Sequence, residues 1–244
     1  MGTSTGYSAP PSWGDLKSDV TRAGGAGALV PNTARGLMQS FIQHNGGANA
    51  IARGGAGGAG GGSVARGRAA RATAGRLGGF ISEVGRVGLD QALRDAGWAD
   101  LVGRPVPEVM AALLDRLGGE ASTIDDVDAR MALARLQDKY FADAVDAAEL
   151  DQRLVEQAPQ LEVVLHDYFG FYLYEVFCRV FFERLVQRLG DTRAHSFLDQ
   201  IRDFITAALA NRAAGADIRR IDWAGPAGQA LTADIMEATL TVFG

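Results

Sequence analysis

Apolar residues recur at intervals of three and four over most of the chain, the spacing that places side chains on one face of an α-helix. The first such pattern begins after Asn32 and ends at Asn45-Gly46-Gly47, which predicts a short amphipathic helix. A second, longer pattern runs from Val64 to Trp98. No stretch offers a convincing series of alternating strands. The sequence therefore predicts an all-α protein built as a helical bundle.

Residues that start or stop helices divide the second half of the chain. Pro105 opens one predicted helix and Gly118 ends it. Thr123, followed three residues later by Asp126, is a variant of the capping box and predicts the start of the next helix. Pro159 separates a shorter helical segment from a long aromatic one. The last helices are expected at residues 160–189, 192–211 and 226–243.

Glycines interrupt the long pattern that begins at Val64. Each would destabilise an exposed helix by roughly 1 kcal/mol relative to alanine. We therefore expect either close approach of a neighbouring helix to the backbone or a break in the helix near Gly78-Gly79. The glycines concerned are Gly75, Gly78, Gly79, Gly85 and Gly88.

The opening MGTSTGYSAPPSWG shows neither a helical nor a strand period, and it is rich in Gly, Ser, Thr and Pro. We expect it to be extended and mobile, and accessible to another protein. The stretch from Gly54 to Ser63 is almost pure Gly and Ala, which is typical of a flexible linker. The expected organisation is a flexible tail at residues 1–31, a tethered short helix and linker at 32–63, and an α-helical domain at 64–244.

Charge is distributed unevenly along the chain. The formal net charge is -5, yet no acidic residue lies between Val20 and Ser82. A cationic first third is typical of a segment that docks on an acidic partner or on nucleic acid. A solubilising arm in an arginine-preferring protein is the alternative, since Lys17 and Lys139 are the only lysines. The arginines in this third are Arg22, Arg35, Arg53, Arg66, Arg68, Arg71 and Arg76.

Candidate catalytic groups do not assemble into a motif. The glycine run lacks the Lys-Ser or Lys-Thr of a phosphate-binding loop. Glu162 and His166 lie one helical turn apart, but the further glutamates and second Glu-x-x-His of a bundle metal site are missing. Cys178, the only cysteine, is expected to be a small buried residue. We assign no catalytic residue, metal ligand or cofactor. The other histidines, His44 and His195, are distant in sequence.

The expected location is the cytoplasm. A single cysteine excludes a disulfide framework, and the N-terminus has no cationic segment followed by an apolar one. The most apolar stretch, residues 161–189, contains charged residues and argues against a membrane span. Its aromatic residues extend round more than one helical face, so they predict either a core or, for some of them, a partner interface. They are Tyr168, Phe169, Phe171, Tyr172, Tyr174, Phe177, Phe181 and Phe182.

Three stretches together resemble the QatB family, a component of the Qat antiphage defence operon: MGTSTGYSAPPS, GRLGGFISEVGRVGLDQAL and LVGRPVPEVMAALLDRL. The resemblance is densest at residues 1–11 and 76–117. It implies a non-catalytic role in a defence complex. The partners it implies are a QueC-like enzyme first, and then the ATPase and the TatD-like nuclease encoded beside it.

The resemblance also implies a role for the N-terminus. Removal of Met1 is expected because Gly2 is small, and it leaves an α-amine whose pKa of about 8 lies well below that of lysine, near 10.4. QueC-type enzymes activate a deazaguanine carboxylate with ATP and deliver ammonia to it. A QueC-like partner that accepted the Gly2 amine instead would join the nucleobase to the protein. Residues Thr3, Ser4, Thr5, Gly6 and Tyr7 would then lie in the partner's channel.

Other interpretations of the tail remain open. It is either disordered without a role, or it docks on a partner without being modified. Myristoylation is disfavoured because Gly6 occupies the position where that motif has Ser or Thr. Nonspecific, salt-sensitive nucleic-acid binding through the basic first third is the alternative function.

Overall fold

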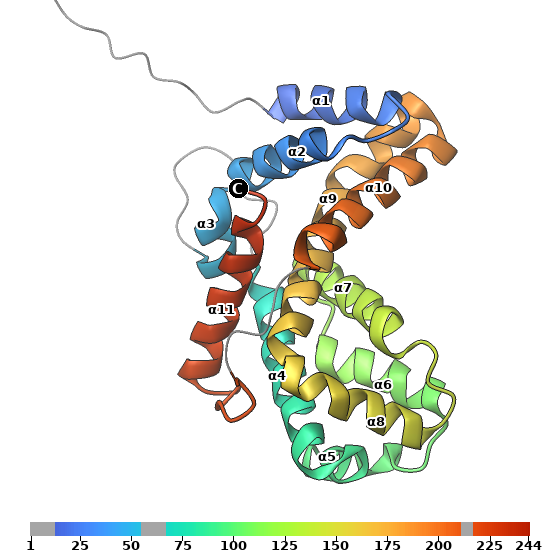
Figure 1. Cartoon of the computed structure of the whole chain (residues 1–244), viewed down its shortest axis with the longest axis vertical. Helices are drawn as coiled ribbons and strands as arrows, with labels where there is room; N and C mark the ends of the chain where they lie inside the picture. The colour runs from blue at the N-terminus through green and yellow to red at the C-terminus, as the bar shows by residue number, and fades with distance from the viewer. Residues whose placement is uncertain (1–12, 55–66, 211–216) are drawn as a thin grey trace, which may run out of the picture.

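All regular structure in the computed structural model, which describes residues 13–54, 67–210 and 217–244, is helical (Figure 1). The predicted all-α fold is confirmed. The helices are α1 (Trp13–Gly25), α2 (Pro31–His44), α3 (Gly47–Arg53), α4 (Arg68–Val87), α5 (Leu89–Asp95), η1 (Ala99–Leu101), α6 (Val106–Gly118), α7 (Ile124–Phe141), α8 (Ala147–Gln157), η2 (Ala158–Gln160), α9 (Leu161–Leu189), α10 (Asp191–Leu209) and α11 (Pro226–Thr241).

The long helix α9 is the centre of the packing. Helices α7 and α10 lie along it, and α1, α4 and α11 also contact it. Every residue from Val164 to Phe177 is buried, so the core interpretation of the aromatic run is confirmed. Phe182 differs, because 36% of its surface is exposed.

Ion pairs join α7 to α9 in antiparallel order. The carboxylate partners on α9, Asp167 and Glu175, are buried, and so is Asp128 on α7. A buried carboxylate without a partner would be strongly destabilising, so these contacts fix the register of the two helices. The pairs are Asp128–Arg179, Arg135–Glu175 and Lys139–Asp167.

The N-terminal region differs from the expected tail at residues 1–31. Residues 13–25 form α1, and Leu16 and Val20 on its inner face are buried against the core. This helix is not evident in the sequence, because the apolar positions are few and Gly24 and Gly25 suggest a loop. Residues 1–12, and residues 55–63 of the predicted linker, lie outside the described residues.

The short helix predicted after Asn32 is present as α2, with Pro31 in its first turn. It is followed by α3, which was not predicted, and whose Ile51 and Ala52 are fully buried. Helix α3 packs against α11, and α2 contributes Phe41 and Met38 to the core. The described part of residues 32–63 is thus packed on the rest of the bundle.

Helix α4 runs unbroken through Gly78-Gly79, so close approach is the correct alternative. A Cβ placed on Gly78 would lie 2.6 Å from the ring of Trp223, in the segment before α11. Gly85 is packed equally closely against Ala158 of η2. The neighbours are therefore side chains of short segments rather than the backbone of a helix. The helix begins at Arg68, after Gly67 at φ 60°, rather than at Val64.

Helix α7 begins with the predicted capping box of Thr123 and Asp126. Three apolar residues at helical spacing, Ile124, Val127 and Met131, are exposed and do not form its buried face. The buried face instead contains small alanines, which allow α9 to approach closely. They are Ala129 and Ala132, next to Leu133 and Leu136.

Replacement of Gly78 by alanine should lower the free energy of unfolding by about 1–3 kcal/mol, because the added methyl group overlaps the Trp223 ring. Gly36→Ala on α2 is the matched control, since no neighbouring side chain lies within 4 Å of the position that its methyl group would take, and alanine favours a helix. That variant should gain about 0.5–1 kcal/mol. Urea unfolding followed by circular dichroism measures both, and equal stabilisation by the two substitutions would contradict the packing described.

Candidate functional site

A groove of about 570 Å³ runs along one face of α4. The α4 residues that line it are spaced by one, three or four positions, so they share a face of the helix. Gly75 and Gly79 contribute no side chain there, which leaves the backbone as the floor of the groove. The α4 lining residues are Arg68, Arg71, Ala72, Gly75, Arg76, Gly79 and Phe80.

Three other segments complete the groove. Trp98 and Leu117 lie at the end where α5 leads into η1 and α6 stops. Trp223 forms a wall, and its indole N–H donates a hydrogen bond to Ser82 at 3.0 Å. The first turns of α11 supply Gln229 and Thr232. Segments that are more than a hundred residues apart in the chain therefore meet here.

Cationic side chains gather at the N-terminal end of this α4 face. Arg71 is half-buried and donates to the carbonyl oxygens of Ile51 and Ala52 at the end of α3. Desolvation of its guanidinium lowers the pKa of Arg71 below its ordinary value. Arg68 is exposed, and within the described residues it has no hydrogen-bond or ion-pair partner.

Arg76 is bound in a similar way to the end of α6. Its guanidinium donates to the carbonyl oxygen of Leu117 at 2.6 Å and to that of Gly118 at 3.0 Å. The hydroxyl of Thr73 also accepts from it, at 3.1 Å. Because all these acceptors are neutral, the positive charge of Arg76 is held in place without being neutralised.

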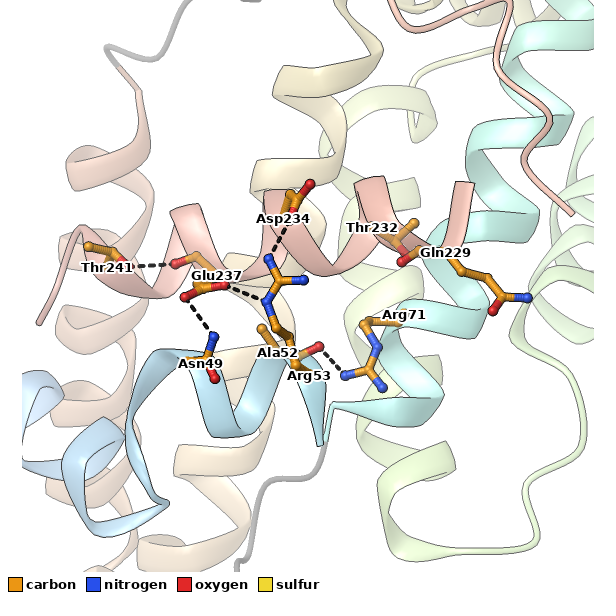
Figure 2. A network of polar contacts seen from close by, with 9 residues as sticks. All are labelled: Asn49, Ala52, Arg53, Arg71, Gln229, Thr232, Asp234, Glu237 and Thr241. Atoms are coloured by element: carbon orange, nitrogen blue, oxygen red, sulfur yellow. Dashed lines mark hydrogen bonds and ion pairs between the residues drawn. The ribbon is translucent and has the colours of Figure 1, made fainter. Parts of the chain in front are cut away.

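A polar network lies beside the groove and ties α3 to α11 (Figure 2). Arg53 of α3 pairs with Glu237 at 2.9 Å and also with Asp234, both on α11. Asn49 donates to the same Glu237 carboxylate at 3.0 Å. Figure 2 places Arg71 next to this network, where its side chain reaches the last carbonyl groups of α3. The network therefore positions one wall of the groove.

The residues proposed as a modification site and tail, Gly2 and Thr3 to Tyr7, lie outside the described residues. The first residue that the structure describes is Trp13. The Trp13 ring packs edge-on against His44, with ring centroids 5.0 Å apart, and against Phe41 at 6.3 Å. The start of α1 is thus fixed on the surface of α2.

The candidate catalytic groups are dispersed. His166 is buried, and its Nδ1 lies 2.6 Å from the hydroxyl of Thr239. That hydroxyl donates to the Ile235 carbonyl, so it accepts from the histidine. Among the described residues, no three His, Cys, Asp or Glu side chains are placed to hold a metal ion. No helix in the described ranges has the length and apolar character needed to cross a bilayer.

A family model described as Qat anti-phage system associated protein QatB matches residues 57–243, which is more than half of the chain. The chain belongs to the QatB family. It is therefore a component of the Qat anti-phage defence system. No curated protein and no solved structure matches the chain.

The QatB match covers every residue that lines the groove, from Arg68 to Thr232. Helices α1–α3 and the N-terminal residues fall before it. Sequence reasoning missed the groove, although Arg68, Arg71 and the α4 glycines stand out in the sequence. Their shared spacing on one helical face was the available signal, but the other walls of the groove come from segments distant in the chain.

The Cys178 thiol of this QatB-family protein should react slowly with thiol reagents while the protein is folded. Burial raises the pKa of Cys178 to about 12, so the reactive thiolate is scarce at neutral pH. Labelling by a disulfide reagent such as dithiobis-nitrobenzoate should be at least 100-fold slower in buffer than in denaturant. Rapid labelling of the folded chain would show that the thiol environment differs from the one described here.

Proposed function

We propose that this QatB-family protein is a non-catalytic part of a cytoplasmic defence complex that presents the Gly2 α-amine to a QueC-like partner. The amine would accept a deazaguanine-type group. Family membership, matched over residues 57–243, supports the setting. The resemblance of residues 1–11, seen in the sequence, supports the role of the terminus. The operon ATPase and the TatD-like nuclease are the further partners in this proposal.

The packing of Trp13 is the observation that carries the proposal. Contacts with Phe41 and His44 hold the start of α1 against α2, so the preceding residues leave from a fixed point of the bundle. A fully extended chain covers about 3.5 Å per residue, so Gly2 would reach up to about 40 Å from Trp13. That length is sufficient to enter the active site of a bound enzyme while the helical body stays outside it.

The chemistry requires only the amine from this chain. The Gly2 nitrogen would attack the carboxyl carbon that the partner has activated with ATP. A C–N bond forms, the C–O bond to the activating phosphate breaks, and the amine releases a proton. At neutral pH the α-amine is deprotonated more often than a lysine amine, which favours it as the nucleophile.

An unmodified adaptor for the operon partners is the second proposal, and the experiment below separates the two. Nucleic-acid binding through the basic first third is less well supported, because many of its arginines bind groups within the protein. Arg22 pairs with Asp19 and Arg35 donates to the Val242 carbonyl. Arg53 is paired with Asp234 and Glu237 of α11.

Intact-mass measurement after co-expression with the QueC-like partner tests the conjugation. We expect a mass increase that fits one deazaguanine acyl group, and tandem mass spectrometry should place it on the N-terminal glycine. A partner variant that cannot activate the carboxylate with ATP should give unmodified protein.

Two variants serve as controls for the acceptor. Gly2→Leu should retain Met1 and lose the adduct, whereas Lys17→Arg with Lys139→Arg removes the side-chain amines of the only two lysines and should keep it. An adduct lost in the lysine variant would reject Gly2 as the acceptor. Unmodified protein that still co-purifies with the partner would favour the adaptor instead.

A further inference from the structure

The groove along α4 has a cationic end and an aromatic end. Arg68, Arg71 and Arg76 occupy the first nine positions of α4, and Phe80 follows one turn later. The Phe80 ring lies against Trp98, with centroids 5.5 Å apart. Because an α-helix rises 1.5 Å per residue, Arg68 and Phe80 are separated by about 18 Å. A ligand that contacted both ends would be elongated, with an anionic group at one end and a ring at the other.

The arginines at the first end form no ion pair with a carboxylate of the described residues. In the part of the chain that the structure describes, none of the three guanidinium groups is paired with a carboxylate. Asp125 attracts Arg71 and Asp126 attracts Arg76 electrostatically, but both carboxylates are hydrogen-bonded elsewhere, Asp125 to Tyr172 and Asp126 to Thr123. Elsewhere the arginines Arg53, Arg116 and Arg130 have carboxylate partners.

Fixed, uncompensated arginines favour an anion with several oxygens. Carbonyl groups hold Arg71 and Arg76 in place. Each side chain still has N–H groups that can donate to a ligand, because a guanidinium group carries five N–H donors. Arginine matches phosphate and carboxylate geometry better than a point charge does. Arg68 lies one turn before Arg71 on the exposed rim, where its side chain can close over a bound anion.

The rest of the groove suits a flat ring. Gly75 and Gly79 line the groove without side chains of their own, and Trp98 and Trp223 add aromatic surface. Gln229 on the opposite wall is exposed and offers an amide donor and acceptor. The volume of about 570 Å³ lies within the range of small-ligand pockets.

We propose that this groove binds a nucleoside phosphate, with its phosphate groups at Arg68, Arg71 and Arg76 and its base at the aromatic end beside Trp98. This site is separate from the proposed role of Gly2 and does not depend on it. A free nucleotide and the phosphorylated end of a single strand share this chemistry. The limited length of the groove favours the free nucleotide.

Calorimetric titration of the full chain with ATP is the primary test, with adenosine and tripolyphosphate as the two half-ligands. ATP should bind saturably with a micromolar Kd, and each half-ligand should bind at least 10-fold more weakly. The affinity for ATP should fall as salt rises. A 5′-phosphorylated oligonucleotide should bind no more tightly than ATP.

Tryptophan fluorescence emission tests whether the ligand binds in the groove. The chain has three tryptophans, and Trp13→Phe leaves only Trp98 and Trp223, both in the groove. Titration of this variant with ATP should change its emission with the same midpoint as the calorimetric curve. A calorimetric signal without an emission change would locate binding elsewhere and reject the proposal.

Two substitutions in the groove test its lining residues, and a third on α10 is the control. Arg68→Glu should weaken ATP binding at least 10-fold, whereas Arg193→Glu, on exposed α10 surface, should change it less than 2-fold. Gly75→Leu fills the floor of the groove and should also weaken binding at least 10-fold, with an unchanged circular dichroism spectrum.

Three results would overturn the proposal. The first is no saturable binding of ATP, GTP, CTP or UTP at millimolar concentration. The second is equal effects of Arg68→Glu and Arg193→Glu. The third is equal affinity for tripolyphosphate and ATP, which would remove the ring from recognition. Tighter binding of the oligonucleotide than of ATP would assign the groove to nucleic-acid ends instead.

Discussion

The burial of α9 is the constraint on which the rest of the structure depends. Between Val164 and Phe177 its side chains are buried on every side, so no single neighbouring helix can cover it. Five helices cover α9 together, namely α7, α10, α11, α1 and α4. The burial also takes His166, Asp167 and Glu175 into the interior, where polar groups need partners. Thr239 and the α7 cations provide them, and in doing so they fix the register of α7 and α11 around α9.

Helix α4 shows how the same packing produces a groove. One side of α4 carries Leu77, Ile81 and Val84 into the core. Another side lacks side chains at its glycines, which lets Trp223 sit directly on Gly78. Trp223 also lies 3.6 Å from the position that a Cβ would take on Gly75 and 3.4 Å from that on Gly79, and both glycines line the groove. The glycines of α4 therefore allow Trp223 to approach the helix closely, and Trp223 becomes one wall of the groove.

The parts of the fold that could be predicted from the sequence are those with local signals. Helices α6, α7 and α9 begin where the proline and capping rules place them. Helices α1 and α3 were missed because Leu16 and Ile51 are buried by helices far away in the chain. The groove was harder still to predict, because Trp98 and Trp223 come from segments that only the fold brings together. Contacts between elements that are distant in sequence form only in the folded bundle, and no local sequence pattern predicts them.

Helix α11 joins the groove to the N-terminal helices. Its first turns carry Gln229 into the groove, and a later turn carries Glu237 to Arg53 of α3. Arg71 makes the complementary connection, because it lines the groove and binds the last carbonyl groups of α3. Helix α3 follows directly from α2, which holds Trp13 at the start of α1. A shift of α11 relative to α4 would therefore change both the width of the groove and the position of α3.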